Sequence, residues 1–380
     1  MENSMDSRLC LCAMNRLFGY EPALGRRLIE NFGSPAAVFS QPEKTLREAL
    51  GQREDLLRGL RPDALAWAEK ELAQTAEAGA RFIGLGEEDY PALLAECPDP
   101  PLGLYVRSAS PPERLFQARE AVAFVGTRDA SPYGREWCVR LVQALAATRQ
   151  PPVIISGLAF GIDRTAHETA LACGLPTLGV MATGIAQVYP WQHRELARKM
   201  ADTPGCGVLT DYPLGTSPVA VNFVRRNRII AGLSRAVVVV ESKTKGGSLI
   251  TAKYANDYDR DVYALPGRVE DPRSQGCNSL IRQRMADIIT TPEDLAARLG
   301  LKPARGSRGA DVVEQAARRY GPDAPETRLV RLVRENRGAS RDELAALTGW
   351  PLHEVLRHTT TLECDGVLTT DLLGRCTFLP

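Results

Sequence analysis

The sequence lacks an excess of charge of either sign. Its 380 residues contain 47 Lys and Arg against 46 Asp and Glu, which gives a formal net charge of +1 at pH 7. A protein without a net positive field has no global electrostatic attraction for a polyanion. Any nucleic-acid partner must therefore be held by a local patch of basic residues.

The sequence also lacks the cysteine spacings of a zinc site or a disulfide framework. Nine cysteines are scattered without a CxxC pair, and the only close pair is Cys10 and Cys12. This pattern indicates reduced thiols in a cytoplasm, and it predicts no metal site. No charged segment followed by an apolar stretch opens the chain, and no apolar run reaches 18 residues. We therefore expect a cytoplasmic protein that is neither exported nor membrane-spanning.

What the sequence does contain is a regular alternation of apolar runs and helical stretches over residues 121–299. The runs are AVAFV, PVIIS, PTLGVM, GVLT, AVVVV and DVYAL. Uninterrupted apolar runs are typical of parallel strands that are buried on both faces. Strands that alternate with helices form βαβ units. The pattern predicts a doubly wound α/β domain, which we place at residues 81–300.

A helical unit is predicted before this domain, over residues 1–80. Within it, LFGYEPALGRRLIENFGSPAAVF alternates short helical pieces with glycine-containing turns. This resembles a SAM-like or helix-hairpin-helix unit, a common module for gripping DNA backbone. A small packing domain is an equally good interpretation.

A second small unit is predicted over residues 325–380, after a linker at 301–324. Its order is three helices followed by a two-stranded wing, which suggests a winged helix, and Ser340 with Glu343 predicts a capping box at the second helix. A winged helix could read duplex DNA through its third helix. That helix offers only a few polar side chains, so protein contact is at least as well supported. They are His353, Arg357 and His358.

Glycine, hydroxyl and basic residues follow nearly every predicted strand. Ligands of open α/β sheets bind outside the carboxyl ends of the strands, where such residues meet. Glycines let backbone N–H groups approach an anion, and helix N-termini add positive potential. The sequence therefore predicts phosphate binding at this edge. The strand-end segments are 126–128, 157–163, 182–184, 241–248 and 266–267.

Two standard phosphate-binding fingerprints are missing. The first strand end has no GxGxxG, which argues against an NAD dinucleotide, and the chain has no GxxxxGK[ST], which argues against a Walker-type ATPase. We therefore predict no cofactor.

The segment VNFVRRNRII at 221–230 places three arginines in four positions. A helical wheel puts Arg226 in the apolar sector, with Arg225 and Arg228 to the polar side. A buried arginine must pair with a carboxylate, such as Glu241 or Asp211, or reach over the sheet edge. Several guanidiniums beside backbone donors suit a polyphosphate chain, and a phenylalanine could stack on a base. Single-stranded nucleic acid is the natural candidate, with Asn222 as a plausible N-cap of the helix.

The motifs VGTR, SGLAFGIDRTAHETAL, NFVRRNRIIAGLSRAVVVVES, GGSLITA, VYALPG and GCNSLI occur together in this order. Over about residues 81–299 the sequence resembles the DNA-processing protein A (DprA/Smf) family. The resemblance implies an extended Rossmann-like domain that binds single-stranded DNA as a homodimer without known catalysis. It further implies a recombination mediator that protects incoming DNA during natural transformation and loads the RecA recombinase.

Residues of the DNA site follow from the resemblance together with the strand-end pattern. Arg128 is expected to contact backbone phosphate, and Phe223 to lie against a base. The complete expected set is Gly126, Thr127, Arg128, Ser156, Gly157, Gly161, Thr183, Gly184, Phe223, Arg225, Arg226, Asn227, Arg228, Lys245, Gly246, Gly247, Ser248 and Thr251. The segment that resembles the dimerisation helix contains Asn278, Leu280, Ile281 and Arg284.

The sequence departs from the family pattern at Ala220 and Val224, where many members carry lysine and proline. One expected phosphate contact is therefore missing, and Arg225 is a candidate to replace it. Many members also carry GA where this chain has RMA at 284–286, which alters the expected dimer helix.

The main alternative is an enzyme, a nucleotide phosphoribohydrolase of the LOG type on a related Rossmann core. That group uses a PGGxGTxxE loop, whereas KGGSLITAKYA lacks both the GT pair and the glutamate. Glu241 is instead expected to orient an arginine or a loop amide. Asp163 and His167 lie on one helical face without a third metal ligand, and we expect them to hold the 157–161 turn by hydrogen bonds. A third class, a winged-helix regulator of duplex DNA, is disfavoured by the neutral tail.

Overall fold

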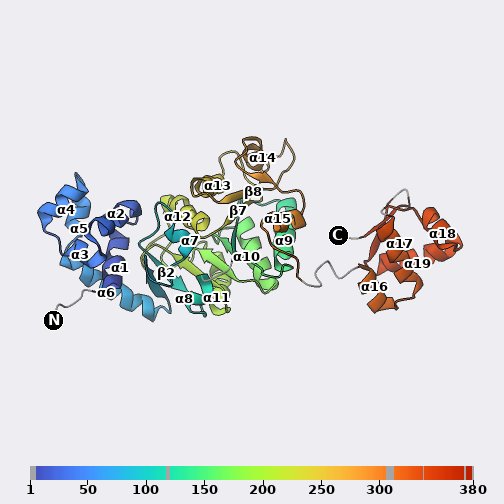
Figure 1. Cartoon of the computed structure of the whole chain (residues 1–380), viewed down its shortest axis with the longest axis horizontal. Coiled ribbons are helices and arrows are strands. Elements are labelled where there is room, and N and C mark those ends of the chain that lie inside the picture. Colours follow the sequence, from blue (N-terminus) through green and yellow to red (C-terminus); the bar gives the residue numbers. More distant parts are fainter. Residues whose placement is uncertain (1–5, 117–119, 305–311, 337, 372–373, 379–380) are drawn as a thin grey trace. The chain divides into compact units, whose positions relative to one another are not determined.

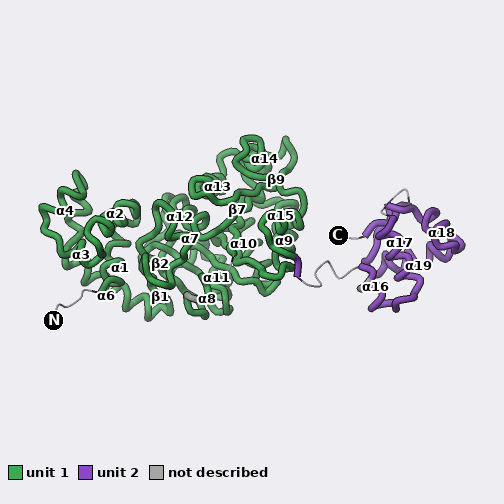
Figure 2. Tube along the Cα trace, viewed as in Figure 1, with its two compact units in different colours: residues 1–302 green, residues 303–380 purple. Residues whose placement is uncertain are grey.

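The computed structural model describes residues 6–116, 120–304, 312–336, 338–371 and 374–378. It divides into two compact units, Met1–Lys302 and Pro303–Pro380 (Figure 2). Among the described residues, no helix is both long and apolar enough to cross a membrane.

The first unit is built on a nine-stranded sheet with the order β1-β2-β6-β5-β4-β3-β7-β8-β9 (Figure 1). In this order every neighbouring pair from β6 to β9 is parallel. The pairs β1–β2 and β2–β6 are antiparallel. All six predicted strands are present, which confirms an α/β fold with a mostly parallel sheet. The strands are β1 (Arg81–Gly84), β2 (Gly103–Arg107), β3 (Ala121–Val125), β4 (Val153–Ser156), β5 (Thr177–Val180), β6 (Gly207–Thr210), β7 (Ala236–Val239), β8 (Asp261–Ala264) and β9 (Asp287–Ile288).

The strand order reverses between β3 and β7. From β3 the chain adds β4, β5 and β6 on one side, and it then returns to place β7 on the other side of β3. The loops that leave β3 and β7 therefore diverge, which opens a crevice at the carboxyl edge of the sheet.

Helices cover both faces of the sheet because successive strand side chains point to opposite faces. On one face, Ala123 and Val125 of β3 share a core with helices α12 and α13. On the other, Val122 and Phe124 pack with α9 and α10. The helices of this region are α7 (Ala92–Ala95), α8 (Pro112–Phe116), α9 (Pro132–Ala146), α10 (Ile162–Ala172), α11 (Arg194–Asp202), α12 (Ala220–Gly232), α13 (Gly247–Asp257), α14 (Gln275–Arg282) and α15 (Pro292–Arg298).

The N-terminal helices pack against the antiparallel end of the sheet. Phe18 and Leu28 lie in one core with Phe82 of β1 and Tyr105 of β2. The SAM-like or helix-hairpin-helix identity of these helices stays a prediction. Their bounds are α1 (Ser7–Leu17), α2 (Pro22–Phe32), α3 (Pro35–Phe39), α4 (Glu43–Leu50), α5 (Glu54–Gly59) and α6 (Pro62–Glu77).

The second unit has its own core of four helices and a two-stranded antiparallel sheet. The capping box of Ser340 and Glu343 is confirmed at α18. Helix α16 lies inside the segment predicted as a linker at 301–324, because Ala316 is buried in this core and stabilises a helix there. The winged-helix assignment stays a prediction. The elements are α16 (Val312–Tyr320), α17 (Pro325–Glu335), α18 (Arg341–Thr348), α19 (Leu352–Cys364), β10 (Leu368–Thr370) and β11 (Cys376–Phe378).

Candidate nucleic-acid interface

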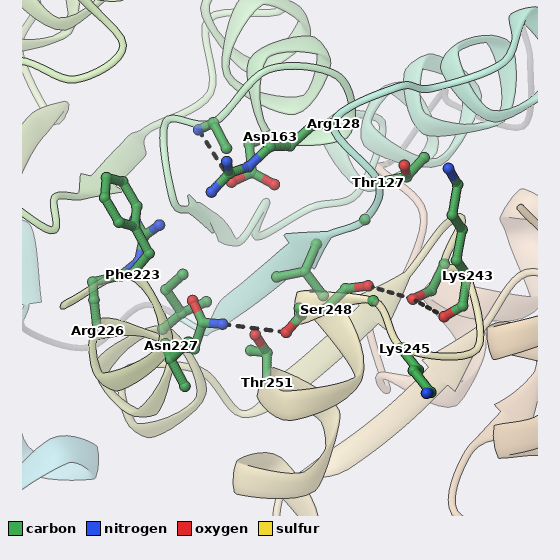
Figure 3. Close-up of a pocket in the computed structure, with 18 of the residues that line it drawn as sticks. Thr127, Arg128, Asp163, Phe223, Arg226, Asn227, Lys243, Lys245, Ser248 and Thr251 are labelled. Carbon is green, nitrogen blue, oxygen red and sulfur yellow. Dashed lines mark hydrogen bonds between the residues drawn. The ribbon is translucent and has the colours of Figure 1, made fainter. Parts of the chain in front are cut away.

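A cleft of about 890 Å³ lies at the carboxyl edge of the sheet, where the strand order reverses (Figure 3). Its walls are the loop after β3, the loop after β7 with the start of α13, and the first turns of α12. This is the position at which open α/β sheets bind ligands.

The loop after β3 is fixed so that Arg128 projects from it. Gly126 approaches α10 closely, since a Cβ there would lie 2.5 Å from Cγ1 of Ile162. The N–H of Thr127 donates a 2.8 Å hydrogen bond to the carbonyl oxygen of Glu241. With its neighbours held in this way, Arg128 is exposed at the cleft.

The opposite wall is the N-terminus of α13. Gly246 caps this helix, and Gly247, Ser248 and Thr251 of its first turns line the cleft. The hydroxyl of Ser248 donates to Oγ of Ser242 at 2.8 Å, which ties the turn to the end of β7. The first N–H groups of a helix have no intrahelical acceptor. They therefore offer donors to an anion in the cleft.

Arg226 forms the floor between α12 and the sheet. Its side chain is buried, and Nη1 donates to the carbonyl oxygens of Gly157, at 2.6 Å, and Val180. This contact requires glycine, since a Cβ on Gly157 would lie 2.6 Å from Nη1. Burial lowers the pKa of Arg226 to about 10, although the nearby Asp163 carboxylate opposes the shift. The guanidinium thus remains a cation at neutral pH, as part of the cleft lining.

The cleft carries more positive than negative charge. Arg128, Lys243 and Lys245 are exposed, and none of them has an ion-pair partner within the part of the chain that the structure describes. Asp129 is already paired with Arg273 at 2.8 Å. Lys243 was not singled out from the sequence, although it stands in the same SKTKGG segment as Lys245.

Aromatic side chains continue the wall formed by α12. The ring centroid of Phe223 lies 5.5 Å from Cζ of Arg128 and 5.2 Å from the ring centroid of Tyr189, in an edge-to-face arrangement. Asn227 donates from Nδ2 to the carbonyl oxygen of Gly247 at 3.2 Å and joins α12 to α13. Tyr189 was missed from the sequence because only the fold brings it to Phe223.

The structure brings eleven of the predicted DNA-site residues together. Those that line the cleft are Gly126, Thr127, Arg128, Phe223, Arg226, Asn227, Lys245, Gly246, Gly247, Ser248 and Thr251. Seven others lie outside its lining, namely Ser156, Gly157, Gly161, Thr183, Gly184, Arg225 and Arg228.

The residues outside the lining have structural contacts of their own. The hydroxyl of Ser156 donates to the carbonyl oxygen of Phe124 at 2.6 Å, and that of Thr183 donates to the carbonyl oxygen of Gln187. Gly161 has a positive φ of 75° and passes directly against Thr127. Gly184 packs equally closely against the backbone near residue 214. These positions shape the strand ends without facing the ligand space.

All three arginines on α12 have partners within the chain, and the partners of Arg225 and Arg228 lie outside the cleft lining. Arg228 is buried and forms a 2.7 Å ion pair with Asp211, itself buried. Arg225 donates to the carbonyl oxygens of Gly19 and Tyr20 and lies over the Tyr20 ring at 4.7 Å. The wheel placed both on the polar side because it does not include the N-terminal helices and the loop after β6.

Asn222 is not the N-cap of α12, contrary to the sequence-based interpretation. The cap position is Val219, which has no side chain able to accept a hydrogen bond. Asn222 is buried instead, and its Oδ1 accepts from the Tyr20 hydroxyl at 3.0 Å.

Asp163 and Glu241 hold loop amides beside the cleft. Asp163 Oδ2 accepts from the N–H groups of Gly157 at 3.1 Å and Ala159 at 3.2 Å. Glu241 accepts from the N–H and hydroxyl of Ser131, at 2.9 and 2.5 Å, and so fixes the start of α9. Burial raises the pKa of Asp163.

His167 does not hold the 157–161 turn as expected. Its Nδ1 lies 2.7 Å from Oγ1 of Thr177, which itself donates to the carbonyl oxygen of Ile154. His193 takes the expected position instead, with Nδ1 at 2.7 Å from the carbonyl oxygen of Leu158. Sequence reasoning could not find this contact, because residues 158 and 193 are distant in the chain.

The predicted dimer segment lies on α14 and the turn after it. Asn278 exchanges two hydrogen bonds with the backbone of Gly267, at 3.2 and 3.0 Å, and Leu280 is buried in the sheet core. Both are therefore used within the chain. Ile281 is partly buried, and Arg284 is exposed with φ of 58°.

The family model for DNA recombination-mediator protein A matches residues 81–300. The chain belongs to this family. It is 36% identical to Protein Smf of Synechocystis over 77% of this chain and 72% of that protein. It is also 37% identical to DNA processing protein DprA of Bacillus subtilis, over 59% of this chain and 73% of that protein.

Solved structures of the same family share the fold. The X-ray structure of DNA processing protein A from Streptococcus pneumoniae superposes with a TM-score of 0.63 at 30% identity, covering 77% of this chain and 98% of that one. DNA processing protein A from Helicobacter pylori, described by its single-stranded DNA binding mode, gives 0.51 at 28% identity, covering 57% and 95%.

Proposed function

We propose that the cleft binds single-stranded DNA through its phosphates and stacks one base on Phe223. The observation that carries the proposal is the meeting of three kinds of group in one cleft. They are cations without carboxylate partners, the open N-terminus of α13, and an aromatic ring. Basic grooves with stacking aromatics bind single strands with little sequence preference.

Membership of the recombination-mediator family supports a wider role. In this proposal the protein acts as a homodimer, protects incoming DNA during natural transformation or repair, and loads the RecA recombinase onto it. The binding mode named for the Helicobacter pylori relative supports the choice of single-stranded DNA. Duplex DNA contact through the C-terminal unit is left to experiment.

The test is a double replacement, Arg128→Ala with Lys245→Ala. Each phosphate contact with a single strand contributes about 0.7 to the slope of log K against log salt. We expect the variant to bind a dT oligomer at least about tenfold more weakly, with a slope lower by about 1.4. Filter binding at several salt concentrations measures both.

The matched control removes one arginine and one lysine elsewhere, Arg140→Ala with Lys199→Ala. Both side chains are outside the cleft lining, so this variant should bind like the wild type. If the cleft variant and the control bind equally well, the site is assigned wrongly. Release of free base from a nucleoside monophosphate would favour the phosphoribohydrolase alternative.

A further inference from the structure

Exposed aromatic side chains occur in two segments that also contribute residues to the cleft lining, around Ala159 and around Tyr189. Trp191 is 70% exposed, Tyr189 47% and Phe160 38%. Among the described residues only two other aromatic side chains, Tyr20 and Tyr133, are comparably exposed. Leaving a tryptophan ring in water forgoes a large burial free energy, so such a concentration indicates a contact surface.

Tyr189 connects this part of the chain to the Phe223 wall. Tyr189 lines the cleft and contacts Phe223 edge to face at 5.2 Å. Two residues later, Trp191 begins a short 3-10 turn, Trp191–His193. The chain thus passes within two residues from a ring of the cleft lining, Tyr189, to an exposed ring outside that lining, Trp191.

The turn that carries Trp191 is held in place through its last residue, His193. His193 is buried, its Nδ1 lies 2.7 Å from the carbonyl oxygen of Leu158, and its ring meets Phe160 edge to face at 4.7 Å. The backbone that presents Trp191 is thus fixed to the loop after β4. A preformed position for an exposed ring lowers the entropy lost when a ligand stacks on it.

We propose that Phe160, Tyr189 and Trp191 extend the base-stacking track beyond Phe223, with Trp191 as its outer platform. The occupant is the same single strand whose phosphates lie in the cleft, and this inference rests on the proposed function. Nucleobases fit because every base offers a π-face, so the track needs no sequence preference. Continuity with the cation-lined cleft distinguishes this occupant from a protein partner.

The test compares Trp191→Ala and Trp191→Leu with Trp191→Phe. Stacking of one base on an aromatic ring is worth a factor of roughly ten or more in affinity. We expect the alanine and leucine variants to bind a long dT oligomer about tenfold more weakly and the phenylalanine variant to stay near the wild type. A stacking contact neutralises no phosphate, so the salt slope should be unchanged in all three variants.

Fluorescence provides a second readout, since the chain has only four tryptophans. We expect a dT oligomer to quench the tryptophan fluorescence of the wild type. A smaller quench in Trp191→Phe would place a base on this ring. Unchanged affinity in Trp191→Ala, or a reduced salt slope, overturns the stacking track while leaving the cleft proposal intact. Failure of the wild type to bind dT at all overturns both. Thermal unfolding checks folding, which an exposed side chain should not affect.

Discussion

Burial makes His167 a neutral residue in the folded protein. The ring is fully buried, and Nε2 has no hydrogen-bond partner among the described residues. Because Thr177 uses its own proton for the carbonyl of Ile154, the Nδ1–H of His167 must donate to Thr177 Oγ1. Burial, with the nearby His193 and Arg226, lowers the pKa of His167 to about 3.

This shift predicts a loss of stability on acidification. Between pH 6.5 and about 3 the unfolded chain binds a proton at His167 that the folded chain excludes, so the free energy of unfolding falls as the pH falls. From about pH 7 to about pH 5.5 the expected loss is about 1.3 kcal/mol. Urea unfolding at these two pH values measures the loss of unfolding free energy for the wild type and for His167→Gln. The difference between the two losses is the contribution of His167.

The exposed His353 provides the control, since His353→Gln should keep the wild-type pH dependence. A His167→Gln variant with the same acid sensitivity as the wild type would show that other groups cause it.

At the scale of elements, α12 joins three parts of the first unit through the contacts of three arginines. Arg225 reaches the loop after α1, Arg226 the ends of β4 and β5, and Arg228 the acid that follows β6. Of the three arginines, only Arg226 also lines the cleft. The helix therefore has a structural function besides carrying Phe223.

Removing Asp211 takes away the near acidic partner of the buried Arg228 and leaves only Asp99, whose Oδ2 lies 3.9 Å from Nε of Arg228. We expect Asp211→Ala to lower the free energy of unfolding by about 3–5 kcal/mol. Replacing both partners with apolar residues, Arg228→Met and Asp211→Leu, should cost less than Asp211→Ala alone. Urea unfolding measures the unfolding free energy of each variant. At urea concentrations below the unfolding transition, each variant should still bind a dT oligomer. A double variant that is less stable than Asp211→Ala would contradict this expectation.

The elements could be predicted from the sequence, but the roles of individual side chains often could not. Six strands followed from uninterrupted apolar runs, because burial on both faces leaves that pattern directly in the chain. The wheel correctly marked Arg226 as buried. It misplaced Arg228 because the carboxylate of Asp211 is brought to it by the sheet, and no local pattern records such contacts. Trp191 and Tyr189 were overlooked for the same reason.

At the scale of the whole molecule, β9 forms an edge of the sheet. Among the described strands it pairs only with β8, and Ile288 on it is 39% exposed. An exposed strand edge with apolar side chains is a template for pairing with another chain. The proposed homodimer would use this side of the first unit.

If the proposed homodimer forms through this edge, Ile288→Lys should reduce it to a monomer, because lysine blocks edge pairing. Light scattering after size exclusion measures the mass. Leu347→Lys, which changes an equally exposed apolar residue in the second unit, is the control. A dimer that survives Ile288→Lys and dissociates with Leu347→Lys would move the interface to the C-terminal unit.

The cation-lined cleft belongs to a molecule whose net charge is only +1. Long-range attraction scales with the field of the whole protein, so it adds little to the rate at which a strand arrives. Affinity must then reside in how slowly the strand leaves once phosphates and bases are engaged. Under the proposed function, such a protein would discriminate by residence time: it would hold flexible single strands that can reach the rings and release rigid duplexes soon after contact.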